Sequence, residues 1–254
     1  MNMMTQGNRQ SQLPGALLAA SIPGLAHYEA SALSSLIAIN RFVGRNVQVA
    51  AEAERTDKLR VFVSGWAMKS VGISGQRRQI IGFVLPGNIE GLHTDFHQTA
   101  TSDVTTLTSC EIAEFRMNDV LALLREFPGI GAGFRAYMAR EAAYLGDQVL
   151  RLGRMTAYER VCHFMLEISD RQTAARANQA TVAFPITQSI VADALGLSVV
   201  HVNRQVMRLR QEGLLDLDRK SLTINDADAL RRISGYKSRT LEMETAPSYA
   251  GAAE

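Results

Sequence analysis

Polar and basic side chains recur along Ser198–Arg210 so that they share one side of a predicted helix. Val202, Val206 and Leu209 recur at helical spacing and mark the opposite, buried side. The polar side carries hydrogen-bonding groups, namely His201, Asn203, Arg204, Arg208 and Arg210. Arginine binds phosphate and the acceptor edge of guanine, and histidine or asparagine can bond a base edge or a phosphate. This combination therefore suits contact with a nucleic-acid duplex.

A second short helix is predicted directly before this one. Its apolar residues recur at helical spacing: Ile190, Val191, Ala194 and Leu195. Thr187 and Ser198 are predicted N-caps for the two helices, and Gly196 can take the left-handed conformation that ends the first. Two short helices joined by a glycine turn, the second of them basic, are typical of a helix–turn–helix that enters a DNA major groove.

The segment Leu217–Ile224 predicts two short strands around a polar turn, which would form a wing beside the helices. Arg219 and Lys220 stand at the tip of this turn, where they could reach phosphate. The alternative is a small helical core whose arginines are only solvated. The wing, the caps and the basic face together favour DNA binding.

Thr187–Arg210 and the wing resemble the DNA-binding half of the Crp/Fnr family of bacterial transcription regulators. The resemblance covers about Leu25 to Tyr236, and three further segments resemble the family's sensory β-roll: Ser64–Trp66, Leu85–Asn88 and Cys110–Phe115. It implies an α+β fold with an N-terminal cyclic-nucleotide-binding-like β-roll, a long dimerisation helix and a C-terminal winged helix–turn–helix. It also implies a homodimer that binds double-stranded DNA, with RNA polymerase as a further partner.

The pattern along the chain predicts five regions: an N-terminal tail over 1–20, the β-roll over 21–128, the dimerisation helix over 129–154, the DNA-binding domain over 155–238 and a C-terminal tail over 239–254. Short alternating segments with glycine turns predict the strands of the roll, and Pro86-Gly87 predicts a type II turn. A short helix is expected over 33–42, a hinge at Gly153 and a loop from Arg171 to Gln179.

The long helix carries a heptad seam. Its apolar residues step by four and three: Met138, Ala142, Leu145, Val149 and Leu152, and Phe134, Tyr137 and Tyr144 widen the same face. Such a face could pack on the chain's own β-roll. The regular spacing, between two domains, favours pairing with a second copy of the chain.

The predicted roll lacks the residues that hold a cyclic nucleotide in relatives that bind one. In those relatives a glycine–glutamate pair and an arginine–serine pair bind ribose and phosphate. The resemblance places Thr101 at the arginine position, while Ser102 keeps the serine and Asp103 adds a negative charge. Glu90 precedes Gly91, so the glycine–glutamate order is also lost. We therefore expect neither cyclic AMP nor cyclic GMP to bind in the usual way.

No cofactor is expected. The iron–sulfur members of the family use four cysteine ligands, but the chain has only Cys110 and Cys162. His93 and His97 could hold a metal or haem with Asp95 or Cys110, although two histidines without a clear third ligand are a weak signal. Neither a nucleophile elbow nor a metal triad surrounds Ser102, Asp103 and His97, which speaks against an enzyme.

Composition agrees with a DNA-binding protein of the cytoplasm. Two cysteines do not make a disulfide framework, and no apolar run approaches the ~20 residues of a membrane span. The formal net charge is only +2, so DNA affinity must come from a local basic cluster.

The base-reading positions depart from the family pattern. Many members open the recognition helix with Arg-Glu-Thr-Val-x-Arg after a serine, whereas Val199 and Val200 take the first two positions here. These valines could contact thymine methyl groups. We expect Arg204 to be the main base contact, and the backbone contacts to come from Gln188, Arg208, Arg219 and Lys220. The two valines leave open an alternative, a module that antagonises a related regulator without binding DNA.

Overall fold

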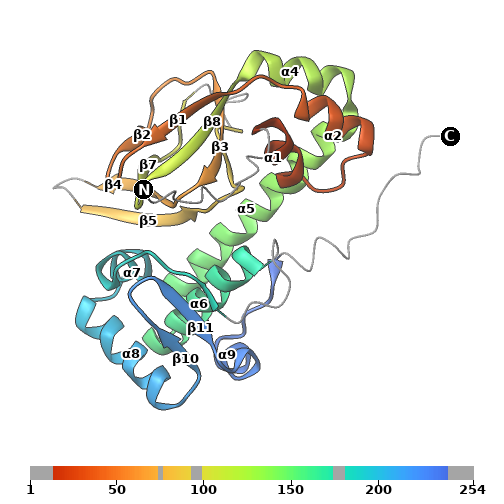
Figure 1. Ribbon diagram of the computed structural model, residues 1–254. Helices are drawn as coiled ribbons and strands as arrows, with labels where there is room; N and C mark the ends of the chain where they lie inside the picture. The colour runs from red at the N-terminus through yellow and green to blue at the C-terminus, as the bar shows by residue number, and fades with distance from the viewer. Residues whose placement is uncertain (1–13, 74–76, 93–98, 174–180, 240–254) are drawn as a thin grey trace, which may run out of the picture.

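The computed structural model describes residues 14–73, 77–92, 99–173 and 181–239. An N-terminal β-rich domain and a C-terminal domain of helices and short strands lie on either side of one long helix, α5 (Figure 1). The α+β fold predicted from the sequence is confirmed.

Two antiparallel four-stranded sheets form the β-roll. One has the order β1-β8-β3-β6, with β1 Ile39–Val43, β8 Cys110–Arg116, β3 Lys58–Ser64 and β6 Ile89–Glu90. The other has the order β2-β7-β4-β5, with β2 Gln48–Ala50, β7 Asp103–Thr106, β4 Ala67–Ile73 and β5 Arg77–Val84. Alternate apolar side chains from both sheets meet inside the roll, among them Val49, Phe62, Val84, Val104 and Ile112.

The predicted type II turn is present. The Asn88 amide donates to the Leu85 carbonyl at 2.9 Å, and Gly87 has φ +85°. A positive φ at the third residue of such a turn favours glycine, which explains the Pro86-Gly87 pair. The turn lies on the side of the roll that faces the C-terminal domain, where it contributes to the junction described below.

The prediction for the start of the chain was wrong in two places. Residues 14–20, expected as tail, belong to α1 (Pro14–Ser21), whose Leu18 is fully buried. The helix expected over 33–42 is α2, which spans His27–Ser34. Residues 39–43 form β1 instead, because pairing with β8 overrides their helical spacing.

Helix α4 (Met117–Glu126) follows β8 and precedes the long helix. Helix α5 spans Pro128–Arg154, 27 residues, which corresponds to about 40 Å at 1.5 Å per residue. Gly153 lies within α5, and the chain leaves the helix at Met155, so the hinge predicted at Gly153 was misplaced.

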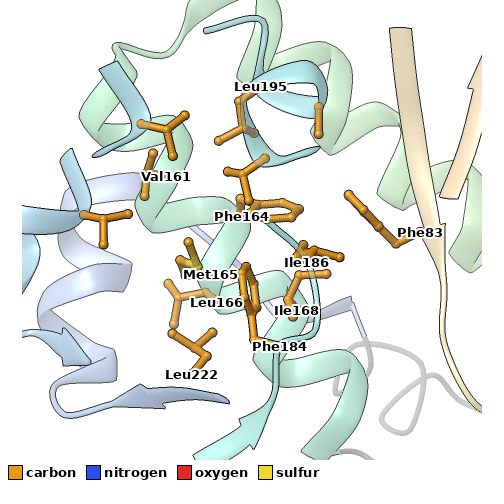
Figure 2. Packing of buried hydrophobic residues seen from close by; sticks show 14 of the residues in the cluster. Phe83, Val161, Phe164, Met165, Leu166, Ile168, Phe184, Ile186, Leu195 and Leu222 are labelled. Atoms are coloured by element: carbon orange, nitrogen blue, oxygen red, sulfur yellow. The ribbon is translucent and has the colours of Figure 1, made fainter. Parts of the chain in front are cut away.

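The C-terminal domain is built on α6 (Ala157–Thr173). Around it lie β9 Thr181–Ala183, α7 Gln188–Leu195, α8 Val199–Gln211, β10 Leu215–Leu217, β11 Ser221–Ile224 and α9 Ala227–Ser234. Figure 2 shows Phe164 and Met165 of α6 in the centre of this domain's core, with Leu195 and Leu222 around them. The loop predicted from Arg171 was wrong up to Thr173, because α6 continues through these residues.

The apolar core does not stop at the domain boundary. Met68, Ile80 and Phe83 of the β-roll belong to the same cluster of buried residues as Phe164 of α6. The Phe83 and Phe164 rings lie 5.5 Å apart, and Phe83 points from β5 toward the C-terminal domain in Figure 2. None of the helices in the described ranges is long and apolar enough to cross a membrane.

Candidate nucleic-acid interface

The two-helix unit forms as its capping residues predict. The Thr187 hydroxyl accepts from the Ile190 amide at 3.4 Å, and Gly196 ends α7 with φ +62°. The Ser198 hydroxyl then accepts from the His201 amide at 3.2 Å and starts α8. These local bonds satisfy amides that the first turn of each helix leaves without a partner. They fix the turn between α7 and α8.

Helix α8 buries one side and exposes the other. Val202, Val206 and Leu209 are fully buried against α6 and α7. The predicted base-reading residues lie together on the opposite side and define the recognition surface: Ser198, Val199, Val200, His201, Asn203 and Arg204. Val200 is 75% exposed, unusually open for a valine. Figure 1 places α8 at the outer edge of the molecule, away from the β-roll.

A side-chain bond joins the two helices beside the recognition surface. The Asn203 side-chain amide donates to the Gln188 side-chain oxygen at 3.1 Å. Gln188 at the start of α7 and Asn203 on α8 therefore act as a pair. Sequence spacing alone placed each of them at the interface but did not show this contact.

Arg208 is engaged within its own chain. Its Nε donates to Glu212 at 2.7 Å, and its guanidinium lies 4.0 Å from the centre of the Tyr158 ring. The Tyr158 hydroxyl donates to the same Glu212 carboxylate, and burial together with this bond raises the pKa of Tyr158. Arg208 was predicted as a phosphate contact. To contact a phosphate, Arg208 must either bind it together with Glu212 and Tyr158 or break these contacts, because the Glu212 carboxylate already neutralises its charge.

The wing has the predicted form. Strands β10 and β11 pair antiparallel, with Leu217 opposite Leu222, and β9 adds a third strand. The Asp218 amide donates to the Ser221 carbonyl at 2.9 Å and closes the turn between them. Arg219 and Lys220 are exposed at its tip. Both side chains are therefore open to solvent, and their contact with phosphate stays a prediction.

The predicted seam on α5 divides into two parts. Between Ala139 and Leu150 the exposed residues of α5 are all apolar or glycine: Ala139, Ala142, Leu145, Gly146, Val149 and Leu150. We call this set the α5 stripe. Met138 and Leu152, also predicted for the seam, are partly buried.

The prediction that Phe134 is a dimer contact was wrong. Phe134 is only 4% exposed and packs in the chain's own core with Ile22 and Tyr137. The Tyr137 hydroxyl accepts from the Ile89 amide at 2.7 Å, so the first half of α5 packs on its own β-roll. The alternative interpretation, that α5 packs on the chain's own β-roll, therefore holds for the first half of the helix.

Thr101 and Ser102, the two positions compared with the nucleotide-binding pair, line a cavity of about 220 Å³ together with Glu90 of the roll and Glu141 of α5. A second space, inside the roll, is far smaller. The cavity between Arg60, Phe62, Ser102 and Val104 measures only about 10 Å³, roughly the space of one water molecule. Asp103 accepts from the Gln48 side chain and the Glu52 amide, each at 2.8 Å. Thr101 is exposed. The possible metal ligands His93, Asp95 and His97 lie outside the described residues.

Charged side chains fill the junction between the roll and the C-terminal domain. Glu167 of α6 binds both Arg151 of α5 and Arg171 of its own helix, and the three side chains are 4–5% exposed. Arg171 also donates to the Phe83 carbonyl and to the Asn88 side chain, each at 2.8 Å. The same cavity of about 220 Å³ adjoins this network, and Lys69, which binds Glu90 at 2.6 Å, lines its other side. No residue pattern in the sequence analysis had indicated this network.

His163 lies at the edge of the same network and is held neutral. Burial, together with the charge of Arg151, lowers its pKa to about 4. Arg151 lies 3.1 Å from Nδ1 of His163 and can only donate, so this nitrogen accepts. The ring also packs edge-on against Tyr236.

Acid should therefore destabilise the protein through His163. In the unfolded chain the His163 pKa is near 6.5, well above its pKa of about 4 in the folded protein. The contribution of neutral His163 to the free energy of unfolding is therefore fully present above pH 6.5 and is lost as the pH falls toward 4. We expect a loss of up to about 3 kcal/mol from this group. Urea unfolding at a series of pH values would measure it. His163→Gln, which keeps an acceptor but does not titrate, should flatten the profile in this range; an identical slope in the variant would refute the assignment.

Comparison with known proteins identifies the C-terminal unit. Residues 159–233 match the family model described as a Crp-like helix-turn-helix domain. The transcriptional regulatory protein btr of Bordetella pertussis is 27% identical over 65% of this chain and 68% of that protein. The nitrogen fixation regulation protein FixK of Azorhizobium caulinodans is 27% identical over 74% of this chain and 76% of that protein.

A solved structure extends the likeness to the whole architecture. The structure of FixK2 from Bradyrhizobium japonicum matches with a TM-score of 0.71 at 24% sequence identity. The match covers 78% of this chain and 98% of that one, so the two share the β-roll, the long helix and the C-terminal domain.

Proposed function

We propose that this chain, which belongs to the Crp/Fnr family of transcription regulators, works as a homodimer that reads a two-fold symmetric duplex site. Each protomer lays α8 in a major groove, and the two half-sites lie about one helical turn, ~34–36 Å, apart. The protein acts in the cytoplasm, without catalytic activity of its own and in contact with RNA polymerase.

The observation that carries this proposal is the exposed recognition surface of α8, flanked by the wing. Val199 and Val200 project beside Arg204, so the surface combines apolar groups for thymine methyls with a guanidinium for guanine. Arg219 and Lys220 at the wing tip supply charge for the phosphate backbone. A surface with these two kinds of group fits a duplex better than it fits a protein antagonist.

The α5 stripe supports the dimer. Leu145, Val149 and Leu150 are 46–65% exposed, and they continue one face of a helix that leads directly to the C-terminal domain. Pairing two copies along this face would bury these side chains, a favourable transfer from water. It would also place the two α8 helices symmetrically.

Arg204 should carry base selectivity. Arg204→Ala is expected to weaken binding to the preferred site by about 1–3 kcal/mol and to relax selectivity at one base pair. Gel-shift titration against the site and its single-base variants would measure this.

Lys220→Ala is the matched control, because Lys220 should contact only phosphate. It should weaken all sequences alike and lower the salt slope by about 0.9 per lost contact. An Arg204→Ala protein that kept full selectivity would contradict the assignment.

We further propose that the signal this regulator receives is not a cyclic nucleotide. Thr101 stands where relatives that bind a cyclic nucleotide have an arginine, and the carboxylates of Glu90 and Glu141 line the same cavity of about 220 Å³. A missing arginine and two carboxylates both disfavour a phosphate and support this proposal. Isothermal titration with cyclic AMP and cyclic GMP should give no heat of binding, and micromolar affinity for either would overturn the proposal.

A further inference from the structure

The carboxyl end of α7 is held by side chains from three other elements. The last carbonyls of a helix have no partner within it and must be satisfied from elsewhere. The Ala192 carbonyl accepts from the Gly196 amide, as the left-handed cap requires. The next three, those of Asp193, Ala194 and Leu195, all accept from side chains outside α7.

Gln148 of α5 supplies one of these donors from a buried position. Its side-chain nitrogen donates to the Ala194 carbonyl at 2.6 Å and to the Ile80 carbonyl of β5 at 3.2 Å. Its side-chain oxygen accepts from Arg151 Nε at 2.9 Å. The partners are two obligate acceptors and one obligate donor, so the orientation of this amide is fixed. One buried side chain thus joins β5, α5 and α7.

Gln79 of β5 approaches the same carbonyls from the other side. Its side-chain nitrogen lies 3.2 Å from the carbonyl oxygens of both Asp193 and Ala194. Gln79 and Gln148, with these two carbonyls, form what we call the glutamine clamp. Arg160 of α6 completes the helix end, because it donates to the Leu195 carbonyl at 3.0 Å.

The clamp is accompanied by apolar and ionic contacts between the same two domains. The Phe83–Phe164 contact and the bonds of Arg171 to the Phe83 carbonyl join the same two domains. Breaking the clamp would leave the Ala194 carbonyl and the Gln148 amide buried without partners, which is costly. The domains therefore have a strongly preferred arrangement in which α7, and α8 with it, is fixed relative to α5.

This arrangement does not cover the recognition surface. Val200 and Arg204 remain exposed while the clamp is closed. We infer that the closed glutamine clamp is the DNA-competent arrangement, in which contacts from β5 and α5 together set the position of α7, and with it α8, relative to the long helix. Loss of the clamp bonds therefore lowers DNA affinity, because α7 and α8 are then no longer held in this position relative to β5 and α5. The inference rests on the proposed DNA-binding function.

Gln148→Ala and Gln79→Ala in the full-length protein test this. Apparent affinity falls in proportion to the fraction of molecules in the competent arrangement, so we expect DNA affinity to drop on the order of tenfold for Gln148→Ala and less for Gln79→Ala. Hydrogen exchange of the α7 amides should become faster in both, while exchange in the α4 amides stays unchanged.

Gln172→Ala is the matched control. Among the residues that the structure describes, its side-chain nitrogen bonds the Ile168 and Ala183 carbonyls, both inside the C-terminal domain. It should leave both α7 exchange and DNA affinity near wild type. If both clamp variants loosen α7 yet bind DNA as tightly as wild type, or more tightly, the inference is wrong. A wild-type protein that binds no duplex would instead refute the proposed function, and unchanged α7 exchange in the variants would then refute the clamp as well.

Discussion

Val149→Glu should convert the protein to a monomer and reduce its affinity for a full two-half-site duplex by roughly 100-fold or more. The loss follows because the second half-site is bound intramolecularly only when the two copies are joined, a gain of about 10²–10⁴. Val149 lies in the C-terminal part of the α5 stripe and, at 65%, is the most exposed large apolar side chain of the stripe. A carboxylate there leaves the folded protomer nearly unaffected but would be buried without a partner between two helices.

Sedimentation velocity and gel shifts on the same preparations would check this result. Arg135→Glu is the control, since Arg135 is exposed on the same helix but lies before the stripe. It should remain a dimer with near wild-type affinity. A Val149→Glu protein that still sedimented as a dimer would show that the stripe is not the interface.

Glu167→Ala should cost on the order of 3–5 kcal/mol of folding free energy. Removing this carboxylate leaves Arg151 and Arg171, both nearly fully buried, without their shared counter-charge. At roughly 2–4 °C per kcal/mol for a chain of this size, Tm should fall by about 6–20 °C. Calorimetry would measure both quantities.

Asp228→Ala provides the comparison for an exposed pair. Asp228 binds Arg231 at 3.0 Å, but the Asp228 side chain is 78% exposed. An exposed ion pair contributes at most about 1 kcal/mol, so this variant should unfold close to wild type. Equal losses in the two variants would mean that burial of the Glu167 network adds nothing to stability.

The recognition helix and wing could be predicted from the sequence because their determinants are local. Thr187, Gly196 and Ser198 cap neighbouring residues within three or four positions, and the wing closes over a short turn. Such signals survive without knowledge of the rest of the fold. The type II turn at Pro86-Gly87 was predictable for the same reason.

The remaining features depend on partners distant in sequence. Tyr158 of α6 meets Arg208 of α8, and Gln148 of α5 meets Ala194 of α7, only after these helices have packed against each other. Phe134 satisfies the heptad pattern, yet it is buried in the chain's own core in one cluster with Ile22 and with Leu59 of the roll. A periodic apolar face indicates which side of a helix is buried, but it does not identify the surface that covers that side.

Selection from random-sequence duplexes by the purified full-length protein tests the central claim most directly. The account predicts an enriched two-fold symmetric motif whose half-sites lie 10–10.5 base pairs apart, and loss of the symmetric pattern when Val149→Glu is used. Failure to enrich any motif at low salt, or enrichment of a single unrepeated element by the wild-type protein, would contradict it.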